Sequence, residues 1–446
     1  MANHIGIDDM LRDWIENKSM NPQSLKQMEG QMREWMQRLG GLLLWLWLKW
    51  LSREYKGSTS ECPHCGNIAG YLRQRDGVLH TMFGRIRYKR SYYGCKICHQ
   101  GHYPLDDKLG LRPNAMSAEV ERLAARVGVQ MPFGKASDLF EELTLVSLSD
   151  QSIGKATQAY GQVVEQIEEE LYQQTHENQV MLERDRQAVR PLRMYGSLDG
   201  GRVQIRAPKG QEQPWRELKI GSWFRARGHP PKTPQGDWTI QAYDISYYSD
   251  VLKAEEFGRI FWATGVERLV DQALELIILG DGARWIWDLV DLHFPQAIQI
   301  VDWFHACEYL TPVAKQAFKD LSQQQQWIQT MRDHLWNGRL DEVIEACQQH
   351  FQARLVSDKD HAQLAVTYFL NNRQRMDYPT YRANGYQIGS GTIESAVKQI
   401  ASQRMKVSGA RWNLDNARWV AKARASFLSG KWDSLATRRE HCQLCA

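Results

Sequence analysis

Three acidic residues stand where a carboxylate could hold a bound cation. Asp199 ends a strand-like run and precedes two glycines, and Asp281 ends another with a glycine on either side. Such small neighbours let a ligand or a nucleic-acid backbone approach closely. Glu394 falls near the start of a helical segment that opens with Gly-Ser-Gly-Thr, and Lys398 shares its helix face, where a lysine can contact phosphate. Carboxylates brought together need cations between them, and their hard oxygens select Mg²⁺ or Mn²⁺.

Two such ions about 4 Å apart activate a water or a 3′-hydroxyl and stabilise the leaving oxygen of a phosphodiester, without a covalent protein nucleophile. Spacing alone does not select these three carboxylates, because the chain has 52 Asp and Glu residues. Asp288, Asp291 and Asp302 are rivals to Asp281. The alternative interpretation is that all three are turn carboxylates and a helix-capping glutamate.

A second constellation is made of cysteines, six of whose eight members form three CxxC pairs. One CxxC places two thiolates on a single knuckle, which is half of a tetrahedral zinc site. The stretch between the first two pairs alternates like antiparallel strands with basic outer positions. We therefore predict a zinc ribbon with structural Zn²⁺, and a reduced thiol cluster without metal is the alternative. The four predicted ligands are Cys62, Cys65, Cys95 and Cys98.

The remaining cysteines are interpreted differently. Cys442 and Cys445 lie at the C-terminus, where a tail without function is favoured over half of a metal site completed by another chain. Cys307 and Cys347 are isolated in helical patterns and are predicted to be core residues.

Charge is unevenly distributed along a chain whose net charge is only +4. The ribbon and the segment after Glu394 are both strongly basic, which is the pattern expected of surfaces that hold a phosphate backbone. Ordinary solvated faces are the alternative. From the ribbon, the candidate DNA contacts are Arg85, Arg87, Lys89 and Arg90.

No secretion or membrane signal is predicted. The N-terminus is acidic and polar, unlike a signal peptide. The apolar run from Leu42 to Leu51 is shorter than the roughly 20 residues that span a bilayer. We therefore expect a cytoplasmic protein with no membrane partner and reduced cysteines.

The elements that would position these groups fall into six segments. Helices are predicted over Ile7–Glu16 and Leu25–Leu51. Two short helices, one over Phe133–Thr144 and one that follows from Leu148, predict a helix-turn-helix, with a structural helical pair as the alternative. The segments are an N-terminal helical region (1–58), the zinc ribbon (59–105), a helical DNA-binding region (106–190), the first part of an α/β core (191–304), a helical insertion (305–385), and core completion with the Glu394 helix and basic C-terminal helices (386–446).

Within 191–304 the pattern changes to strands first and then to alternating helix and strand, which indicates a mixed sheet with helices packed on it. Beyond Asp302 strand signals stop for about 80 residues. The predicted strands and helices are Leu192–Asp199, Val203–Ala207, Glu217–Phe224, Thr239–Ser246, Ala254–Thr264, Leu276–Asp281, Ala283–Leu292 and Ala297–Val301.

The sequence resembles insertion-sequence transposases of the Kra type, bacterial enzymes related to the Mutator-like DDE transposases. The resemblance covers about residues 190–430 well and the N-terminal third loosely. It is carried by five blocks: Tyr195-Gly-Ser-Leu-Asp199-Gly-Gly, Trp215-Arg-Glu-Leu-Lys-Ile-Gly, Leu279-Gly-Asp281-Gly-Ala-Arg-Trp-Ile-Trp, Ile300-Val-Asp302-Trp-Phe-His305-Ala-Cys-Glu-Tyr-Leu and Gly389-Ser-Gly-Thr-Ile-Glu394-Ser.

The resemblance implies an RNase H-like catalytic core with Asp199 on its first strand, Asp281 on its fourth and Glu394 on a late helix. The long interval before Glu394 fits the all-helical insertion of such relatives. Asp302 and His305 match an Asp-x-x-His element that organises the site, so they are secondary candidates. A core histidine is the alternative for His305.

The activity implied is Mg²⁺- or Mn²⁺-dependent nicking at the ends of an insertion sequence, with two ions in the site, followed by attack of the freed 3′-hydroxyl on target DNA. The ribbon and N-terminal helices would bind the terminal inverted repeats, and the enzyme would act as a homodimer or higher oligomer. A nuclease that cuts without joining and a non-enzymatic DNA-binding protein are the alternatives. The residues expected to line the DNA path near Glu394 are Arg404, Lys406, Arg411 and Trp412.

Overall fold

A computed structural model describes residues 24–52, 57–112, 115–207, 210–211, 214–229, 239–351 and 360–445. The predicted helix Ile7–Glu16 lies outside these residues. The chain divides into two compact units, the first comprising Met1–Ala124, Ser137–Asp150 and Glu440–Ala446, and the second Ala125–Ala136 and Gln151–Arg439.

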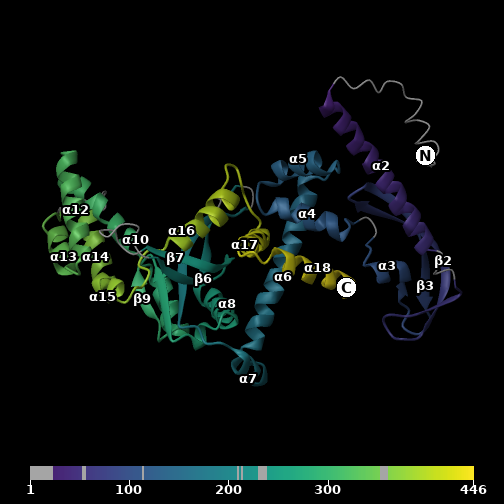
Figure 1. Ribbon diagram of the computed structural model, residues 1–446. Helices are drawn as coiled ribbons and strands as arrows, with labels where there is room; N and C mark the ends of the chain where they lie inside the picture. Colours follow the sequence, from purple (N-terminus) through teal and green to yellow (C-terminus); the bar gives the residue numbers. More distant parts are fainter. Residues whose placement is uncertain are drawn as a thin grey trace. The chain divides into compact units, whose positions relative to one another are not determined.

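The first unit contains a long helix and a four-stranded antiparallel sheet (Figure 1). Helix α2 spans Leu25–Leu51, as predicted, and is followed by strands β1 (Thr59–Glu61), β2 (Ile68–Thr81), β3 (Gly84–Cys95) and β4 (Gly101–His102). A tight turn joins β2 to β3, and Gly84 adopts a φ of +91° there, which favours glycine. A short helix, α3 (Pro104–Leu109), follows the sheet.

The core of this unit lies between α2 and the β2–β3 hairpin. Leu48 of α2 packs with Leu79, Ile86 and Tyr88 of the hairpin. Exposure alternates along β3, as the predicted strand with basic outer positions requires. One basic position departs from that pattern, because Arg90 is buried and forms an ion pair with Asp106.

The second unit is built on a five-stranded mixed sheet (Figure 1). Its strands are β5 (Arg193–Gln204), β6 (Trp215–His229), β7 (Thr239–Asp250), β8 (Glu275–Gly280) and β9 (Ile298–Val301), in the spatial order β7-β6-β5-β8-β9. β5, β6 and β7 pair antiparallel, whereas β5, β8 and β9 are parallel. The mixed sheet predicted from the pattern is therefore confirmed.

Helices cover both faces of this sheet. On one face, α8 (Ala254–Glu267) and α9 (Arg284–His293) pack on the central strands. On the other lie α16 (Gly391–Val397), a π-helical segment (Lys398–Met405) and α17 (Leu414–Leu428). Leu198 and Gly221, which pair across β5 and β6, face the layer of α8 and α9. The next pair, Asp199 and Ile220, faces the layer of α16 and α17.

The described residues between β9 and α15 (Tyr378–Ala383) are mostly helical and contain no strand, as predicted for the insertion. The helices are α10 (Trp303–Glu308), α11 (Leu310–Ala317), α12 (Leu321–Trp336), α13 (Leu340–Gln348), α14 (His361–Asn372) and α15. These helices form the green group beside β9 in Figure 1. Their buried residues belong to the same hydrophobic cluster as β8 and β9, so the insertion extends the sheet's core.

Between α3 and β5 in the sequence, the chain forms α4 (Ala118–Gly128), α5 (Phe133–Thr144), α6 (Asp150–Gln174) and α7 (Asn178–Gln187). After α17 it forms α18 (Trp432–Cys445). The expected helix-turn-helix is wrong in one respect, because α6 is a 25-residue helix rather than a short recognition helix. α6 lies tightly against α17: a Cβ at Gly161 would come 2.0 Å from the carbonyl oxygen of Trp419.

A buried ionic network joins α6, α17 and β7. Lys422 contacts the carboxylates of Glu168 and Asp250, and Arg418 binds Asp250 at 2.7 Å. The side chains of Lys422, Glu168 and Asp250 are each less than a tenth exposed. Arg418 and Lys422 of the basic segment after Glu394 are therefore paired with carboxylates inside the protein, so the predicted phosphate-binding surface could involve only its other basic residues.

Candidate catalytic and metal sites

Strand register brings three aspartates to one row. Leu198 of β5 pairs with Gly280 of β8, which pairs with Val301 of β9. The next residue of each parallel strand is an aspartate, namely Asp199, Asp281 and Asp302. Neighbouring strands are about 4.8 Å apart, so the three backbones lie side by side.

The prediction that Asp199 ends its strand is wrong, because β5 continues antiparallel to β6 as far as Gln204. It marks instead the point where parallel pairing with β8 stops. The backbone N–H of Gly200 donates to Oδ1 of Asp199 at 2.5 Å and holds the carboxylate in place.

The pKa of Asp199 reflects its burial and the charged groups near it. Burial raises the pKa of Asp199 to about 6, against the lowering effect of the Gly200 N–H. The charges of Asp281 and Glu394 raise this pKa further, and His305 lowers it. The other two predicted carboxylates and the predicted histidine therefore lie near enough for their charges to act on Asp199.

Asp281 sits on a turn held from the helical insertion. Its Oδ1 accepts the N–H of Ala283 at 2.8 Å, and its backbone carbonyl accepts the phenol of Tyr368 at 2.9 Å. Gly282 has a φ of +96°, and a Cβ there would lie 2.6 Å from the Tyr368 ring. The turn thus needs glycine for both conformation and space.

Sequence reasoning missed Tyr368 and its neighbour Asn372, whose side-chain oxygen accepts the indole N–H of Trp287 at 3.0 Å. Both residues lie in α14, a helix without any motif, so no local signal could have identified them.

Glu394 is presented by α16, which packs closely on β5. Ile393 and Ile400 are buried on the sheet side and leave Glu394 exposed. A Cβ at Gly201 would be 2.7 Å from the Cβ of Ala401, so this glycine permits the helix to approach the strand. The hydroxyl of Ser390 donates to Oε1 of Glu394 at 3.5 Å.

Asp302 connects the sheet to this helix. It is fully buried and accepts the backbone N–H of His305 at 2.5 Å and that of Ser390. Both carboxylate oxygens are therefore occupied by backbone donors, and the residue positions Ser390 just before α16. His305 is about one third exposed and lies with Nδ1 3.4 Å from Glu308, so it is not a core histidine.

The other two rival carboxylates point elsewhere. Asp288 is 65 % exposed and lies 3.6 Å from Arg284 on α9. Asp291 accepts the side-chain amide of Gln299 at 2.6 Å. Neither is among the charges that act on Asp199.

The four predicted zinc ligands converge. The Cys62 and Cys98 sulfurs are 3.6 Å apart, as are those of Cys65 and Cys95, and all four lie within 4.8 Å of one another. Zn–S bonds of about 2.3 Å in a tetrahedron require sulfurs roughly 3.8 Å apart, so the spacing suits a structural zinc site. The side chain and backbone of Asn67 lower the pKa of the Cys65 thiol to about 6.

Over the described part of the chain, this quartet is the one group of three or more potential ligands gathered so tightly. The remaining predictions for cysteine divide. Cys307 and Cys347 are buried core residues, as expected. The side chains of Cys442 and Cys445 lie outside the described part.

The predicted DNA contacts on the hairpin separate by exposure. Arg85, Arg87 and Lys89 alternate along one exposed side of β3. Arg90 points inward, where Asp106 and the ring of Tyr103 surround its guanidinium, so it is a structural residue.

The same division holds near Glu394. Lys398, Lys406 and Arg411 are exposed, whereas Arg404 and Trp412 are buried. Nε of Arg404 donates to the carbonyl of Gly128 at 2.9 Å, and the Trp412 indole donates to Met405. The expectation that Arg404 and Trp412 line a DNA path is therefore corrected.

One exposed cation was missed. Arg206 and Arg411 line an open pocket of about 420 Å³ beyond the end of β5. Nε of Arg206 donates to the backbone carbonyl of Arg411 at 3.0 Å, which fixes the pair. Two guanidinium groups on a shared concave surface suit a phosphate.

No protein-family model matches the chain, and no curated protein matches it. Among the helices in the described residues, none combines the length and apolar composition needed to cross a membrane.

Proposed function

We propose that this protein is a DDE transposase that cleaves DNA ends and transfers them to target DNA, with Asp199, Asp281 and Glu394 as its metal-binding carboxylates. The observation that carries the proposal is that Asp199 and Asp281 follow paired residues where the parallel pairing of β5 and β8 ends, and that the charges of Asp281 and Glu394 act on Asp199. The sheet also supports an RNase H-like core, because Asp199 lies on its first strand and Asp281 directly follows its fourth.

The donor set suits a hard divalent cation. Three carboxylates whose mutual repulsion contributes to a raised pKa at Asp199 are an arrangement that bound cations stabilise. A pair of Mg²⁺ ions held there would supply Lewis-acid stabilisation of the attacking and leaving oxygens. The carboxylates of Asp199 and Asp281 each accept a hydrogen bond from a nearby backbone N–H, whereas Glu394 is exposed on its helix.

The surrounding residues support DNA as the substrate. Lys398 lies one helical turn beyond Glu394 and is exposed, and Arg206 and Arg411 offer a second phosphate position on the same unit. The exposed cations of β3 would contact the terminal inverted repeats, and the cysteine quartet would hold Zn²⁺ to keep that hairpin in shape.

The test compares Asp281→Asn with Asp288→Asn on DNA carrying the element's ends. Asp281→Asn should reduce Mg²⁺-dependent cleavage by roughly 10³-fold or more, by analogy with loss of one transition-state-stabilising group. Asp288→Asn changes an exposed carboxylate seven residues on and should cleave normally. Undiminished cleavage by Asp281→Asn would refute the assignment.

A nuclease of the same fold is the second candidate, since the same carboxylates would serve it. Pre-cut ends carrying a 3′-hydroxyl separate the two activities. Joining of these ends to a target plasmid supports a transposase, whereas cleavage without joining identifies a nuclease.

A further inference from the structure

Helix α2 carries an exposed apolar seam along its whole length. The residues of this seam are 36–70 % exposed, and from Met32 to Trp50 they recur at alternating intervals of four and three. Its members are Leu25, Met32, Met36, Leu39, Leu43, Leu46 and Trp50. Such a repeat has a period of 3.5 residues, which is the pattern of a helix that pairs with another helix in a left-handed coiled coil.

The seam is separate from the side of α2 that folds onto its own unit. Leu44, Trp45, Leu48 and Leu51 face the β2–β3 hairpin. The seam residues are therefore not needed for the hairpin core and stay available to a partner.

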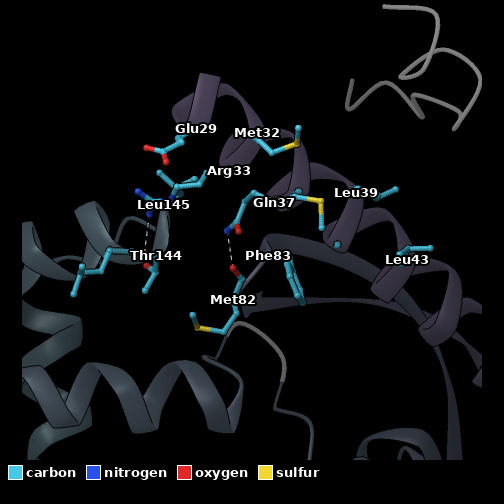
Figure 2. A pocket seen from close by; sticks show the side chains of 13 residues that line it. Glu29, Met32, Arg33, Gln37, Leu39, Leu43, Met82, Phe83, Thr144 and Leu145 are labelled. Carbon is cyan, nitrogen blue, oxygen red and sulfur yellow. Dashed lines mark hydrogen bonds between the residues drawn. The ribbon is translucent and has the colours of Figure 1, made fainter. Parts of the chain in front are cut away.

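Part of the seam, Met32 to Leu43, lines an open groove of about 940 Å³ (Figure 2). Phe83 at the hairpin turn and Leu143 and Leu145 form part of its lining. Arg33 donates to the carbonyls of Glu142 and Leu143, and Gln37 donates to that of Met82 at 2.6 Å. The groove is therefore a fixed surface with an apolar floor.

The charges of α2 select the occupant and its direction. Glu29 occupies the remaining position of the heptad seam and is exposed. In a parallel pair of α2 helices, Glu29 would face its own counterpart within an apolar seam, which is destabilising. In an antiparallel pair centred between Met36 and Leu39, Glu29 instead comes within one turn of Lys49 of the partner subunit.

We propose that α2 pairs antiparallel with α2 of a second copy of this chain. Met36 then packs against the partner's Leu39, and Leu25 against the partner's Trp50. Every apolar seam residue meets an apolar one except Leu46, which lies opposite the partner's Glu29. The same surface serves both copies, as a two-fold dimer requires. This dimer is independent of the chemistry proposed above, since its evidence and its tests concern assembly alone.

The first test measures the mass of the full chain in solution by light scattering and sedimentation. The wild-type chain of 51.7 kDa should behave as a dimer at micromolar concentration. Met36→Glu with Leu43→Glu should give a monomer with unchanged circular dichroism, because both side chains are more than half exposed. Leu182→Glu, an exposed leucine on α7, is the control and should leave the dimer intact.

A monomeric wild-type chain would overturn the proposal and point to another occupant of the seam. A dimer that survives Met36→Glu with Leu43→Glu would also overturn it.

The second test fixes the direction. Glu29→Lys should weaken dimerisation by roughly tenfold, because it places two lysines together. Adding Lys49→Glu should restore the affinity. Failure of the double variant to recover would exclude the antiparallel arrangement.

Discussion

The cysteine quartet and the proposed carboxylate trio would hold a metal ion in two different ways. The cysteines come from the two ends of one hairpin, and their sulfurs already lie at tetrahedral spacing. The carboxylates come from two strands and a helix that an insertion separates, and Glu394 remains exposed. Structural zinc sites are closed, whereas catalytic sites keep positions open for substrate.

The difference is also one of support. Each pair of cysteines occupies a local turn, so its geometry is set within a few residues. Asp281 and Glu394 depend instead on contacts from Tyr368 and from Asp302 through Ser390. An open site thus needs more of the surrounding protein to fix its ligands than a closed one.

The largest effect should follow loss of the closed site. Cys65→Ser, or removal of metal by a chelator, should unfold the ribbon, because structural zinc contributes on the order of 10 kcal/mol to such folds. Metal analysis and calorimetry would show loss of one Zn²⁺ per chain and of the first unit's transition. Asp281→Asn is the control and should retain its zinc. A chain purified without zinc but with an ordered ribbon would contradict the assignment.

The next largest effect should come from removing the Asp302 carboxylate, which supports the start of the Glu394 helix. Asp302→Ala leaves the His305 and Ser390 N–H groups without their carboxylate, which should cost roughly 3 kcal/mol in urea unfolding. The Mg²⁺ concentration for half-maximal cleavage should also rise, since Glu394 is less firmly placed.

The matched control for that variant is Asp320→Ala. Asp320 caps α12 by accepting the N–H of Gln323 at 2.9 Å, far along the chain from the carboxylates. It should lose about 1 kcal/mol with no change in Mg²⁺ dependence. Equal Mg²⁺ dependence in both variants would reduce Asp302 to a simple helix cap.

A smaller, opposite effect is expected within the open site. Asp199→Asn should stabilise the metal-free protein at pH 7 by roughly 2 kcal/mol after allowance for screening. The pKa of Asp199 is raised from 3.8 to about 6, so the folded state binds its proton more tightly. Stability is therefore lost as pH rises through this interval, and the variant should gain nothing at pH 3.5.

Thermal unfolding across pH measures this gain, and Asp288→Asn should show none. Added Mg²⁺ should stabilise the wild-type protein more at pH 7 than at pH 5. A destabilised Asp199→Asn variant at pH 7 would mean that the carboxylates are not in mutual repulsion.

The smallest effect should come from the exposed face of the hairpin. Lys89 pairs with Asp76 at 2.6 Å, but both side chains are more than 60 % exposed, so Lys89→Gln should change stability by less than about 0.5 kcal/mol. It should reduce the salt dependence of DNA binding by about one unit of slope. Arg90→Gln, which breaks a buried pair one residue away, should instead cost roughly 3 kcal/mol.

Much of the fold followed from local patterns. The run from Leu276 to Gly280 was apolar enough to predict a central strand, and the alternation before Cys95 predicted the hairpin. Residues 303–383 lacked alternation and proved helical where described. The length of α6 was not predicted, because the pattern from Leu148 onward was assigned to one short helix.

The site was less accessible to sequence reasoning. Glycine flanks drew attention to Asp199 and Asp281, but only the strand register shows that they are neighbours. Burial determines which basic residues can contact DNA, and the sequence does not reveal it. Arg404 is buried and Lys398 is exposed, although both are basic residues in the same segment. Their difference is set by the packing of elements distant along the chain.

The helical excursion after β9 is closed at its base. The N–H of Trp303 donates to the carbonyl of Ile388 at 3.0 Å, and the N–H of Ser390 to Asp302. The core itself thus fixes both ends of a long loop, and the entropy of closing such a loop grows only slowly with its length. Only parts of the excursion outside the core that it shares with β8 and β9 can therefore vary in length at little cost to the sheet. The Tyr368 phenol of the excursion donates directly to the carbonyl of Asp281, so this part of it also holds the turn that carries a proposed metal ligand.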